Sequence, residues 1–224
     1  MVVGDSASSP QGILELARYL ARFKSVPRTG WVDRGVEREL VESVADHSFG
    51  VALFAWLCAL QRHAEGATIA PERVLKLALI HDLAEGETGD ITPYDPAAMP
   101  DQENPVARRA FLETRHIREV DRDAEKRVRE DASMERLLAR LPESTRLEME
   151  AVWDELRLGN SVEARFVKQV DRLETFLQSR HYLGTYPTLP MSSFRQEVMD
   201  TIDDPLLAAI RDAALDDGAT PSSD

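Results

Sequence analysis

The sequence predicts an all-α protein built as one domain. Apolar residues recur at steps of three and four along most of the chain, the spacing of amphipathic helices, and no segment of comparable length shows the alternation of a strand. The 224 residues, 43% hydrophobic and 30% charged, are enough for one substantial core. We expect the folded domain to span residues 11–215, between disordered tails over residues 1–10 and 216–224.

Seven segments carry the helical spacing. Ser43 and Asp46 resemble a capping box at the start of the second segment, and Pro71 suits the first turn of the third. The charged run from Arg108 to Arg140 alternates in sign, as expected for one or two solvated helices. The predicted helices lie near residues 11–23, 43–64, 71–85, 105–140, 143–158, 160–182 and 192–215.

Two connections have compositions that favour a site. Lys24 to Glu42 concentrates basic and aromatic residues in an acidic chain, among them Arg28 and Trp31. Gly86 to Pro105 is long and rich in Pro, Gly and Asp. Long connections in compact domains often build binding sites, so we expect these two to do so.

The dipeptide His81-Asp82 ends the third predicted helix on the face that should be buried. His81 continues the stripe of Val74 and Leu77 at helical spacing, and Asp82 lies four residues after Ala78. Taking an ionised carboxylate out of water costs several kcal/mol unless it is paired or bound to a metal ion. A divalent cation here would offset that cost.

Two other predicted helices carry polar groups on inward faces. His47 follows Val44 by three residues and precedes Val51 by four, and Asp171 follows Val167 by four. Three helices therefore each direct a candidate ligand toward the core.

The candidate ligands are His47, His81, Asp82 and Asp171. Two imidazoles and two carboxylates suit Mn, Fe, Co, Ni or Zn better than Ca or Mg, and leave coordination positions for water and substrate. The alternatives are core histidines with satisfied hydrogen bonds and carboxylates paired with neighbouring cations, such as Arg172 for Asp171. Neither alternative explains why all four groups fall on inward faces.

The order His, then His-Asp, then a distant Asp resembles the HD-domain metal-dependent phosphohydrolases. The flanking segments are more similar still to the 5′-deoxynucleotidase branch of that family, and they cover roughly residues 13–183. These segments are Pro27–Trp31, Glu42–Ser48, Ile80–Glu85, Gly89–Ile91 and Glu163–Asp171. The resemblance implies a helical HD-domain bundle, one catalytic divalent metal ion per subunit, dephosphorylation of deoxynucleoside 5′-monophosphates, and a homodimer.

Two acidic residues near the ligands are the predicted catalytic groups. Glu85 follows His81 by four residues, which places it at the rim of the same face, able to orient or deprotonate a water. The resemblance also marks Glu85 as catalytic and places Asp90 beside the substrate, where its carboxylate can accept a hydrogen bond from a sugar hydroxyl. The alternative for both is a solvated acid near a helix end.

Arg28 and Trp31 are the other predicted substrate contacts. Arg28 suits a bidentate contact with phosphate, and Trp31 suits stacking on a base or closing against the sugar to exclude an extra hydroxyl. A surface ion pair for Arg28 and a lid over the core for Trp31 are the alternatives. Lys168 and Arg172 are predicted to face solvent. His63, His116 and His181 are predicted to have no ligand role.

Composition argues against several other classes of protein, among them nucleic-acid-binding and membrane proteins. A net charge of −13 opposes binding of nucleic acid polymers, but not of small phosphates held by local cations. The longest apolar run, Val51–Leu60, is too short for a membrane span, and the amino terminus lacks a signal-peptide pattern. Cys58 is the only cysteine, which excludes an intramolecular disulfide and favours core packing. We therefore expect a cytoplasmic enzyme with a small nucleotide substrate and no membrane partner.

Two other functions remain open at this point. One is a different HD-type hydrolase that acts on cyclic nucleotides, triphosphates or a guanosine alarmone, for which the pocket must accept a longer phosphate chain. The other is a helical regulatory or scaffold protein that keeps the metal for stability or sensing. Glu85 and Asp90 favour catalysis, because a structural metal site does not need spare acids beside the ion.

Overall fold

The computed structural model describes residues 9–217, and these residues form helices, turns and loops without a strand. The prediction of an all-α protein is confirmed. In chain order the elements are α1 (Ser9–Phe23), α2 (Thr29–Arg34), α3 (Val44–Ala64), α4 (Pro71–Ile80), α5 (Glu85–Thr88), the 3-10 helix η1 (Pro96–Ala98), α6 (Pro105–Glu113), α7 (Val120–Leu138), α8 (Glu143–Leu158), α9 (Val162–Thr185), α10 (Ser192–Thr201) and α11 (Pro205–Asp217).

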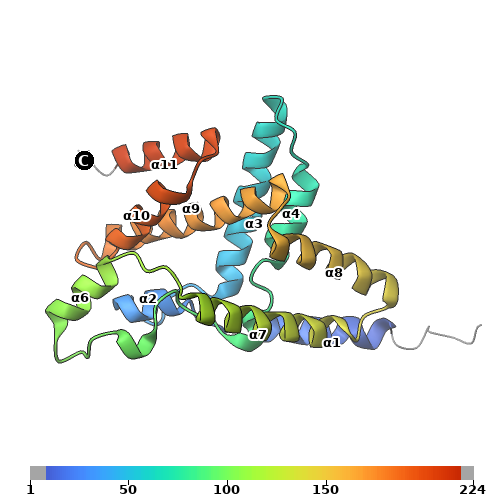
Figure 1. Cartoon of the computed structure of the whole chain (residues 1–224), viewed down its shortest axis with the longest axis horizontal. Coiled ribbons are helices and arrows are strands. Elements are labelled where there is room, and N and C mark those ends of the chain that lie inside the picture. The colour runs from blue at the N-terminus through green and yellow to red at the C-terminus, as the bar shows by residue number, and fades with distance from the viewer. Residues whose placement is uncertain (1–8, 218–224) are drawn as a thin grey trace, which may run out of the picture.

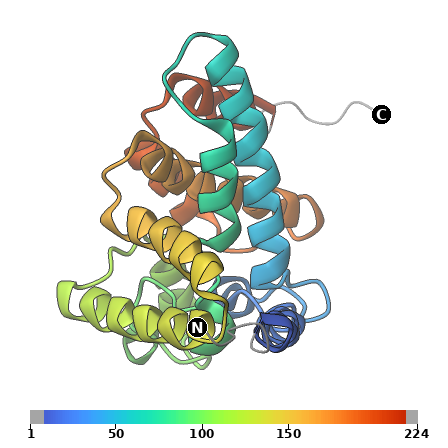
Figure 2. The ribbon, with the colours of Figure 1, turned by 90° about the vertical axis from the view of Figure 1, so that its right-hand side faces the viewer.

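Helices α3, α4 and α9 form the centre of the core. Figures 1 and 2 show α4 beside α3, with α9 crossing the pair. The buried face of α3 carries small side chains, including Ala52, Ala55 and Ala59, which let the neighbouring helix approach closely. Val74 and Leu77 of α4 are fully buried opposite them. The inward faces of these three helices also carry the candidate ligands, so the core fixes where the ligands meet.

A smaller apolar cluster lies beside the main core. It contains Trp31, Val36, Tyr182 and Met191, all buried. This cluster packs the short helix α2 against the end of α9 and the segment before α10. Because α2 is only one or two turns long, its position depends on this packing rather than on helix propensity.

Helix α4 is shorter than predicted. The predicted helix over 71–85 ends at Ile80, and residues 81–84 form a turn before α5. Two i→i+3 backbone hydrogen bonds, from Leu83 to Ile80 and from Glu85 to Asp82, replace the regular helical pattern there. The Nδ1 atom of His81 also bonds the Ala78 carbonyl at 2.7 Å, competing with the backbone for that acceptor.

Two other predicted helices are divided. The segment over 105–140 breaks at residues 114–119, which leave the helix between α6 and α7. The segment over 192–215 breaks after Thr201, and Asp204 caps the start of α11 through the backbone N–H groups of Leu206 and Leu207. Pro205 then takes the first helical position. Helix α2 lies in a segment predicted as a connection.

The predicted tails lie mostly outside the described residues. Within the description, residues 9 and 10 belong to α1, and residues 216 and 217 belong to α11. The helices therefore begin and end two residues beyond the predicted limits of the domain.

By length and composition alone, helix α3 is long and apolar enough to cross a membrane, and 44% of its most apolar 18-residue stretch is buried inside the protein. Its buried face packs in the protein core and carries His47. Length and composition are weak evidence for such a span, because the core helix of a soluble protein can be as long and as apolar.

Candidate active site

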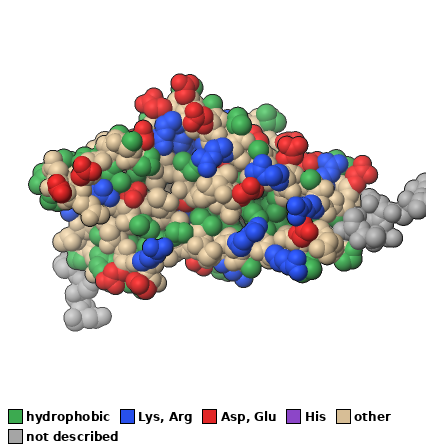
Figure 3. Space-filling model, turned by 90° about the horizontal axis from the view of Figure 1, so that it is seen from below, with side chains coloured by type: hydrophobic (Ala, Val, Ile, Leu, Met, Phe, Trp, Pro, Cys, Tyr) green, Lys and Arg blue, Asp and Glu red, His purple; other side chains and the backbone are tan. Residues whose placement is uncertain are grey.

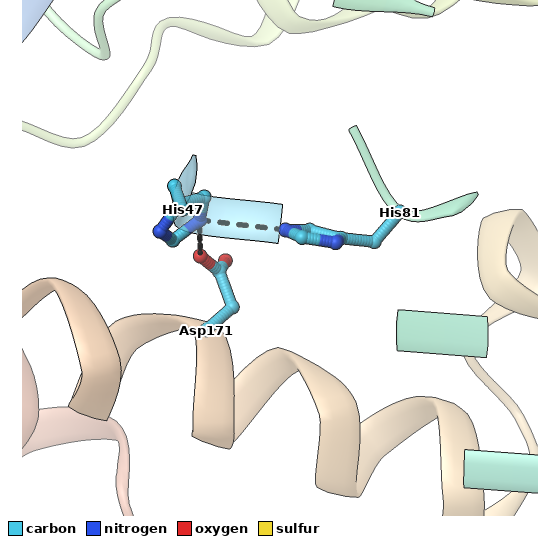
Figure 4. Close-up of side chains that lie close together, drawn as sticks. All are labelled: His47, His81 and Asp171. Atoms are coloured by element: carbon cyan, nitrogen blue, oxygen red, sulfur yellow. Dashed lines mark hydrogen bonds and ion pairs between the residues drawn. The ribbon is translucent and has the colours of Figure 1, made fainter. Parts of the chain in front are cut away.

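The four predicted ligands converge in the structure. The Nε2 atom of His47 lies 3.1 Å from Oδ1 of Asp171 and 3.4 Å from Nε2 of His81. These three side chains point toward one another from α3, the turn after α4, and α9 (Figure 4). Oδ2 of Asp82 lies 3.2 Å from Nε2 of His81 and 3.6 Å from Nε2 of His47. All four groups therefore surround one small volume.

The capping of α3 fixes His47. The Ser43 hydroxyl accepts a hydrogen bond from the Asp46 N–H, and the Asp46 carboxylate accepts one from the Ser43 N–H, so the predicted capping box is present. The cap starts the helix at Val44, which puts His47 on its first full turn. The His47 side chain has no exposed surface and points into the core.

Hydrogen bonds fix the tautomers of the two imidazoles. Nδ1 of His47 lies 2.7 Å from Oε2 of Glu174, and Nδ1 of His81 lies 2.7 Å from the Ala78 carbonyl oxygen. A carboxylate and a carbonyl oxygen only accept, so we assign a hydrogen to each Nδ1 atom. In the neutral imidazoles both Nε2 atoms then present lone pairs toward each other. Such a pair needs a proton or a metal ion between them.

The pKa shifts of His47 and Asp82 indicate that the space between the candidate ligands favours positive charge. Burial acts to lower the pKa of His47, but its hydrogen bonds to Asp171 and Glu174 outweigh burial and raise that pKa to about 10. Burial also acts to raise the pKa of Asp82, whereas the neighbouring His81 holds it well below its usual range. A position that retains a proton so firmly also suits a divalent cation, which competes with that proton for the same lone pairs.

The residues therefore fit a metal ion. Their donor atoms come from two imidazoles and two carboxylates, and the atoms of His47, His81 and Asp171 all lie within 4.8 Å of one another. Ligands at about 2.0–2.2 Å from a shared ion have separations of this order. Glu174 behind His47 and the Ala78 carbonyl behind His81 supply the outer hydrogen bonds that orient metal-binding histidines.

Arg28 lies beside the ligands with its charge directed at two carboxylates. One guanidinium nitrogen lies 3.6 Å from Oδ2 of Asp82 and 3.7 Å from Oδ1 of Asp90, and the other donates to the Thr175 hydroxyl at 3.3 Å. Burial acts to lower the pKa of Arg28, but the Asp90 and Asp82 charges outweigh it and raise that pKa. Arg28 thus stays charged beside the candidate ligands.

Asp90 ties the loop after α5 to the start of α2. Its Oδ2 accepts a hydrogen bond of 2.5 Å from the Thr29 N–H, and its carbonyl accepts one of 2.9 Å from the Thr29 hydroxyl. The carboxylate therefore caps the first turn of α2 and leaves Oδ1 toward Arg28. Gly89 has a φ of 76°, a left-handed conformation that favours glycine and turns the chain before Asp90.

Glu85 is buried at the wall of a pocket beside the candidate ligands, with 3% of its surface exposed. Burial and the nearby Asp82 charge raise its pKa well above the usual value, while Lys126 acts in the opposite direction. Oε1 accepts from Lys126 at 3.1 Å. A carboxyl group with a raised pKa in a pocket is suited to proton transfer.

A pocket of about 310 Å³ lies beside the candidate ligands, and Arg28 and Asp90 are among its lining residues. Asp82, Glu85 and Asp171 are at its walls, and further along lie Tyr94, His116 and Phe194. Pockets that bind small molecules have volumes from about 300 Å³ upward. The pocket therefore has room for a small ligand next to the candidate ligands.

A family model described as the HD domain matches residues 20–209. The chain belongs to the HD-domain family. This HD-domain chain is 35% identical over 177 residues to the 5′-deoxynucleotidase HDDC2 of Mus musculus, across 79% of the chain and 73% of that protein. It is 28% identical over 180 residues to the 5′-deoxynucleotidase hdd1 of Schizosaccharomyces pombe, across 79% of the chain and 75% of that protein.

Solved structures share the fold. A conserved hypothetical protein from Pyrococcus furiosus superposes with a TM-score of 0.65 at 23% identity, over 90% of this HD-domain chain and 98% of that chain. A protein described as a predicted metal-dependent phosphohydrolase from Magnetospirillum magnetotacticum gives 0.64 at 21% identity, over 97% and 96%. At these identities the likeness concerns the HD-domain fold.

Trp31 occupies a different environment from that expected of a stacking residue. Its side chain is 1% exposed, and its ring packs against Tyr182 and Phe194 at centroid distances of 5.2 Å and 4.8 Å. Its Nε1 donates to Oε1 of Glu42 at 2.8 Å. Trp31 still lines the HD-domain pocket, so in this conformation it is placed as a wall rather than as a stacking platform.

Several residues of this HD-domain pocket lie outside the predicted site. Lys126 comes from the charged segment predicted to be solvated, and Arg172 from a position predicted to face solvent. Arg118 and His116 come from the break between α6 and α7. In the sequence no motif marks that segment, which lies inside the predicted helical segment over 105–140.

Arg34 holds the outer wall of the pocket together. Its guanidinium donates to the carbonyl oxygens of Pro190 and Leu112 and to the Ser193 hydroxyl, at 3.1, 3.2 and 2.9 Å. It also lies over the ring of Phe194 at 4.4 Å. A buried arginine with this many acceptors joins α2, α6 and α10 of the HD-domain fold.

Proposed function

We propose that this protein hydrolyses deoxynucleoside 5′-monophosphates to deoxynucleosides and phosphate. The observation that carries the proposal is the meeting of the four candidate ligands at the wall of a pocket that Arg28, Asp82, Glu85 and Asp171 line. The named relatives are 5′-deoxynucleotidases and match over most of the chain. Their activity supports the same reaction class for a site of this composition.

His47, His81, Asp82 and Asp171 would hold one divalent ion per subunit. The chemistry that such an ion supplies when bound is polarisation of a phosphoryl oxygen and a lowered pKa of water. The mixture of nitrogen and oxygen donors favours Mn, Co, Fe, Ni or Zn over Mg. Elemental analysis of the purified protein, followed by reconstitution of chelated protein with each ion, tests the identity and the number of ions bound.

Four side chains have the other proposed roles in binding and hydrolysis. Glu85 accepts the proton of the attacking water, because it is a buried carboxyl group at the pocket wall. Arg28 contacts the phosphate and offsets the charge that develops on it. Asp90 accepts a hydrogen bond from the sugar or from water through Oδ1, while its Oδ2 stays bonded to Thr29. Trp31 closes the pocket against the sugar.

The size of the pocket favours a monophosphate over a triphosphate or an alarmone. A volume of about 310 Å³ lies at the low end for small-molecule sites, and a triphosphate or an alarmone needs space for a longer phosphate chain. The burial of Glu85 in the pocket argues against a purely structural metal site. A structural site gains nothing from a second buried acid beside the ligands.

One assay separates these functions. Chelated protein is incubated with deoxy- and ribonucleoside mono-, di- and triphosphates and with each divalent ion in turn, while free phosphate and pyrophosphate are measured. Phosphate released mainly from deoxynucleoside monophosphates supports the proposal. Pyrophosphate or triphosphate released from longer substrates supports another HD-type hydrolase. Stoichiometric metal binding without any hydrolysis supports a non-catalytic protein.

The predicted homodimer remains a proposal, and the exposed face of α3 is its best candidate surface. Phe49, Leu53, Leu57 and Leu60 are 69%, 43%, 53% and 41% exposed and follow one another at helical spacing. A continuous apolar stripe of this kind usually marks an interaction site. We propose that a second copy of this chain covers it in a cytoplasmic enzyme.

The oligomeric state can be measured directly. The double variant Leu53→Glu/Leu57→Glu should behave as a monomer in analytical ultracentrifugation, whereas the parent sediments as a dimer. Leu147→Glu on α8, at a residue 51% exposed, is the matched control and should leave the dimer intact. A monomeric parent, or a parent that floats with lipid vesicles, would contradict the dimer.

Polymeric nucleic acid is not among the proposed partners. Viewed from below, the Lys and Arg side chains alternate with Asp and Glu and with apolar groups, without a continuous basic surface on that face (Figure 3). The net charge of −13 acts in the same direction. Absence of binding to DNA and RNA oligonucleotides at low salt would agree with this expectation.

A further inference from the structure

Lys126 differs from the other cations of its helix. Helix α7 is rich in charges, and Arg127, the next residue, is 54% exposed and pairs with Asp123 on the surface. The Lys126 side chain is 16% exposed and lines the pocket. Its ammonium group lies 3.1 Å from Oε1 of Glu85 and 2.6 Å from Oε1 of Glu130.

The two oxygens of Glu85 are held unequally. Oε1 accepts from Lys126, whereas Oε2 is buried and has no hydrogen-bond partner among residues 9–217. A buried carboxylate oxygen without a donor is costly, so such an atom usually meets a water or a ligand that the protein itself does not supply. Oε2 is therefore the oxygen of Glu85 that is left without a partner and can take up a proton.

Lys126 is itself anchored from behind. Glu130 lies one turn further along α7 and forms an ion pair with the Lys126 ammonium group through Oε1. Arg157 of α8 lies 3.5 Å from Oε2 of Glu130. The chain of contacts from Arg157 through Glu130 and Lys126 ends at Glu85. Because α7 and α8 are packed helices, this chain restricts where the ammonium group can lie.

We propose that Lys126 is a positioning residue for hydrolysis, which holds Oε1 of Glu85 so that Oε2 accepts the proton of the attacking water. The inference rests on the proposed function, in which Glu85 is the base. The positive charge of Lys126 also offsets part of the repulsion between the Glu85 carboxylate and the carboxylates of Asp82 and Asp90. Lys126 acts through Glu85 and does not contact the substrate.

The first test compares variants of Lys126 in steady-state hydrolysis of a deoxynucleoside monophosphate. Lys126→Met should lower kcat by about tenfold or more with little change in KM, as expected when a group that orients a catalytic residue is lost. Lys126→Arg keeps the charge and should recover most of the lost kcat. Arg127→Met is the matched control and should have the kcat of the parent.

The second test repeats the substitution without the Glu85 charge. In a Glu85→Gln background, Lys126→Met should change kcat by less than about twofold, because the carboxylate on which it acts is already gone. An equal loss of kcat in both backgrounds would show that Lys126 acts independently of Glu85. An increase in KM at unchanged kcat would show that Lys126 binds the phosphate. Either result overturns the proposal.

A third measurement uses metal-free protein and no substrate. Lys126→Met leaves Glu85 without its charge partner and should lower the denaturant midpoint, while Glu85→Gln/Lys126→Met should return it toward that of the parent. Additive losses of stability would contradict the pairing. If the parent hydrolyses no nucleotide, the proposed function fails, and the unfolding cycle still shows whether the pairing exists.

Discussion

Nδ1 of His47 donates a hydrogen bond to Oε2 of Glu174 across 2.7 Å, so that Nε2 is left to face the other ligands. Glu174→Gln removes the negative charge behind the imidazole and makes His47 a weaker donor to a metal ion. We expect the affinity for Mn²⁺ to fall by about tenfold to a hundredfold. Isothermal titration of chelated protein measures this change.

The control for that variant is Glu148→Gln, at an exposed carboxylate on α8 that pairs with Lys76. It carries the same change of charge away from the site and should leave the affinity for metal unchanged. Equal affinities for the Glu174→Gln variant and the parent would mean that Glu174 does not support the ligand.

Gly50 lies against the same carboxylate. A Cβ atom at this position would lie 2.6 Å from Oε1 of Glu174, which is closer than real Cβ contacts allow. Gly50→Ala should displace Glu174 from His47 and lower the affinity for metal in the same direction as Glu174→Gln. Gly184→Ala in α9, where nothing lies within 4 Å, is the control and should have no effect.

Asp171 and Glu85 are expected to separate binding from turnover. Asp171→Ala removes a candidate ligand 3.1 Å from His47 and should abolish both metal binding and activity. Glu85→Ala should keep the metal and lose activity by about a hundredfold or more, the usual contribution of a general base. Metal content and phosphate release are measured on the same samples. A Glu85→Ala variant with the parent rate would exclude its role as base.

Trp31 is predicted to discriminate between sugars. Trp31→Ala opens the wall of the pocket and should raise the activity on ribonucleotides relative to deoxyribonucleotides. The same variant removes a buried aromatic side chain, which costs about 3–5 kcal/mol of stability, so Trp31→Phe is assayed beside it. The measurement is the ratio of kcat/KM for dAMP to that for AMP. An unchanged ratio in both variants would show that Trp31 does not discriminate between the two sugars.

Cys58 provides a prediction about pH. Burial, with a smaller contribution from Asp204, raises the pKa of its thiol to about 11 from an ordinary value of 9.0. Between these values the folded state binds the proton more strongly than the unfolded chain, so stability is lost as pH rises through this window. Cys58→Ala should lose less stability than the parent between pH 9 and 11 in denaturant melts. Parallel curves would contradict the shift.

The convergence of the four candidate ligands could be predicted because each is a polar side chain on the apolar face of a predicted helix. Periodicity places His47 and Asp171 on the inward faces of helices that the structure confirms; His47 is fully buried, whereas the Asp171 side chain keeps 35% of its surface exposed. The predicted position of His81 and Asp82 beside the other candidate ligands also holds, although α4 ends at Ile80, the residue before His81. The inward direction of His81 survives because its backbone keeps right-handed helical angles and its Nδ1 bonds the Ala78 carbonyl.

The outer wall of the pocket was not predictable in the same way. Lys126 looks like any other cation in a charged helix, and only its packing beside Glu85 and Glu130 sets it apart. Spacing gives the face of a helix, whereas the neighbours that cover that face depend on tertiary packing.

The ligands of the candidate metal centre come from α3, the turn after α4, and α9, so one ion would tie together segments as distant as residues 47 and 171. An ion bound only by the native arrangement adds its binding free energy to that arrangement, about 2.7 kcal/mol when free ion stands a hundredfold above its dissociation constant. Metal supply in the cell would then govern how long each molecule escapes degradation, as well as how fast it turns over substrate.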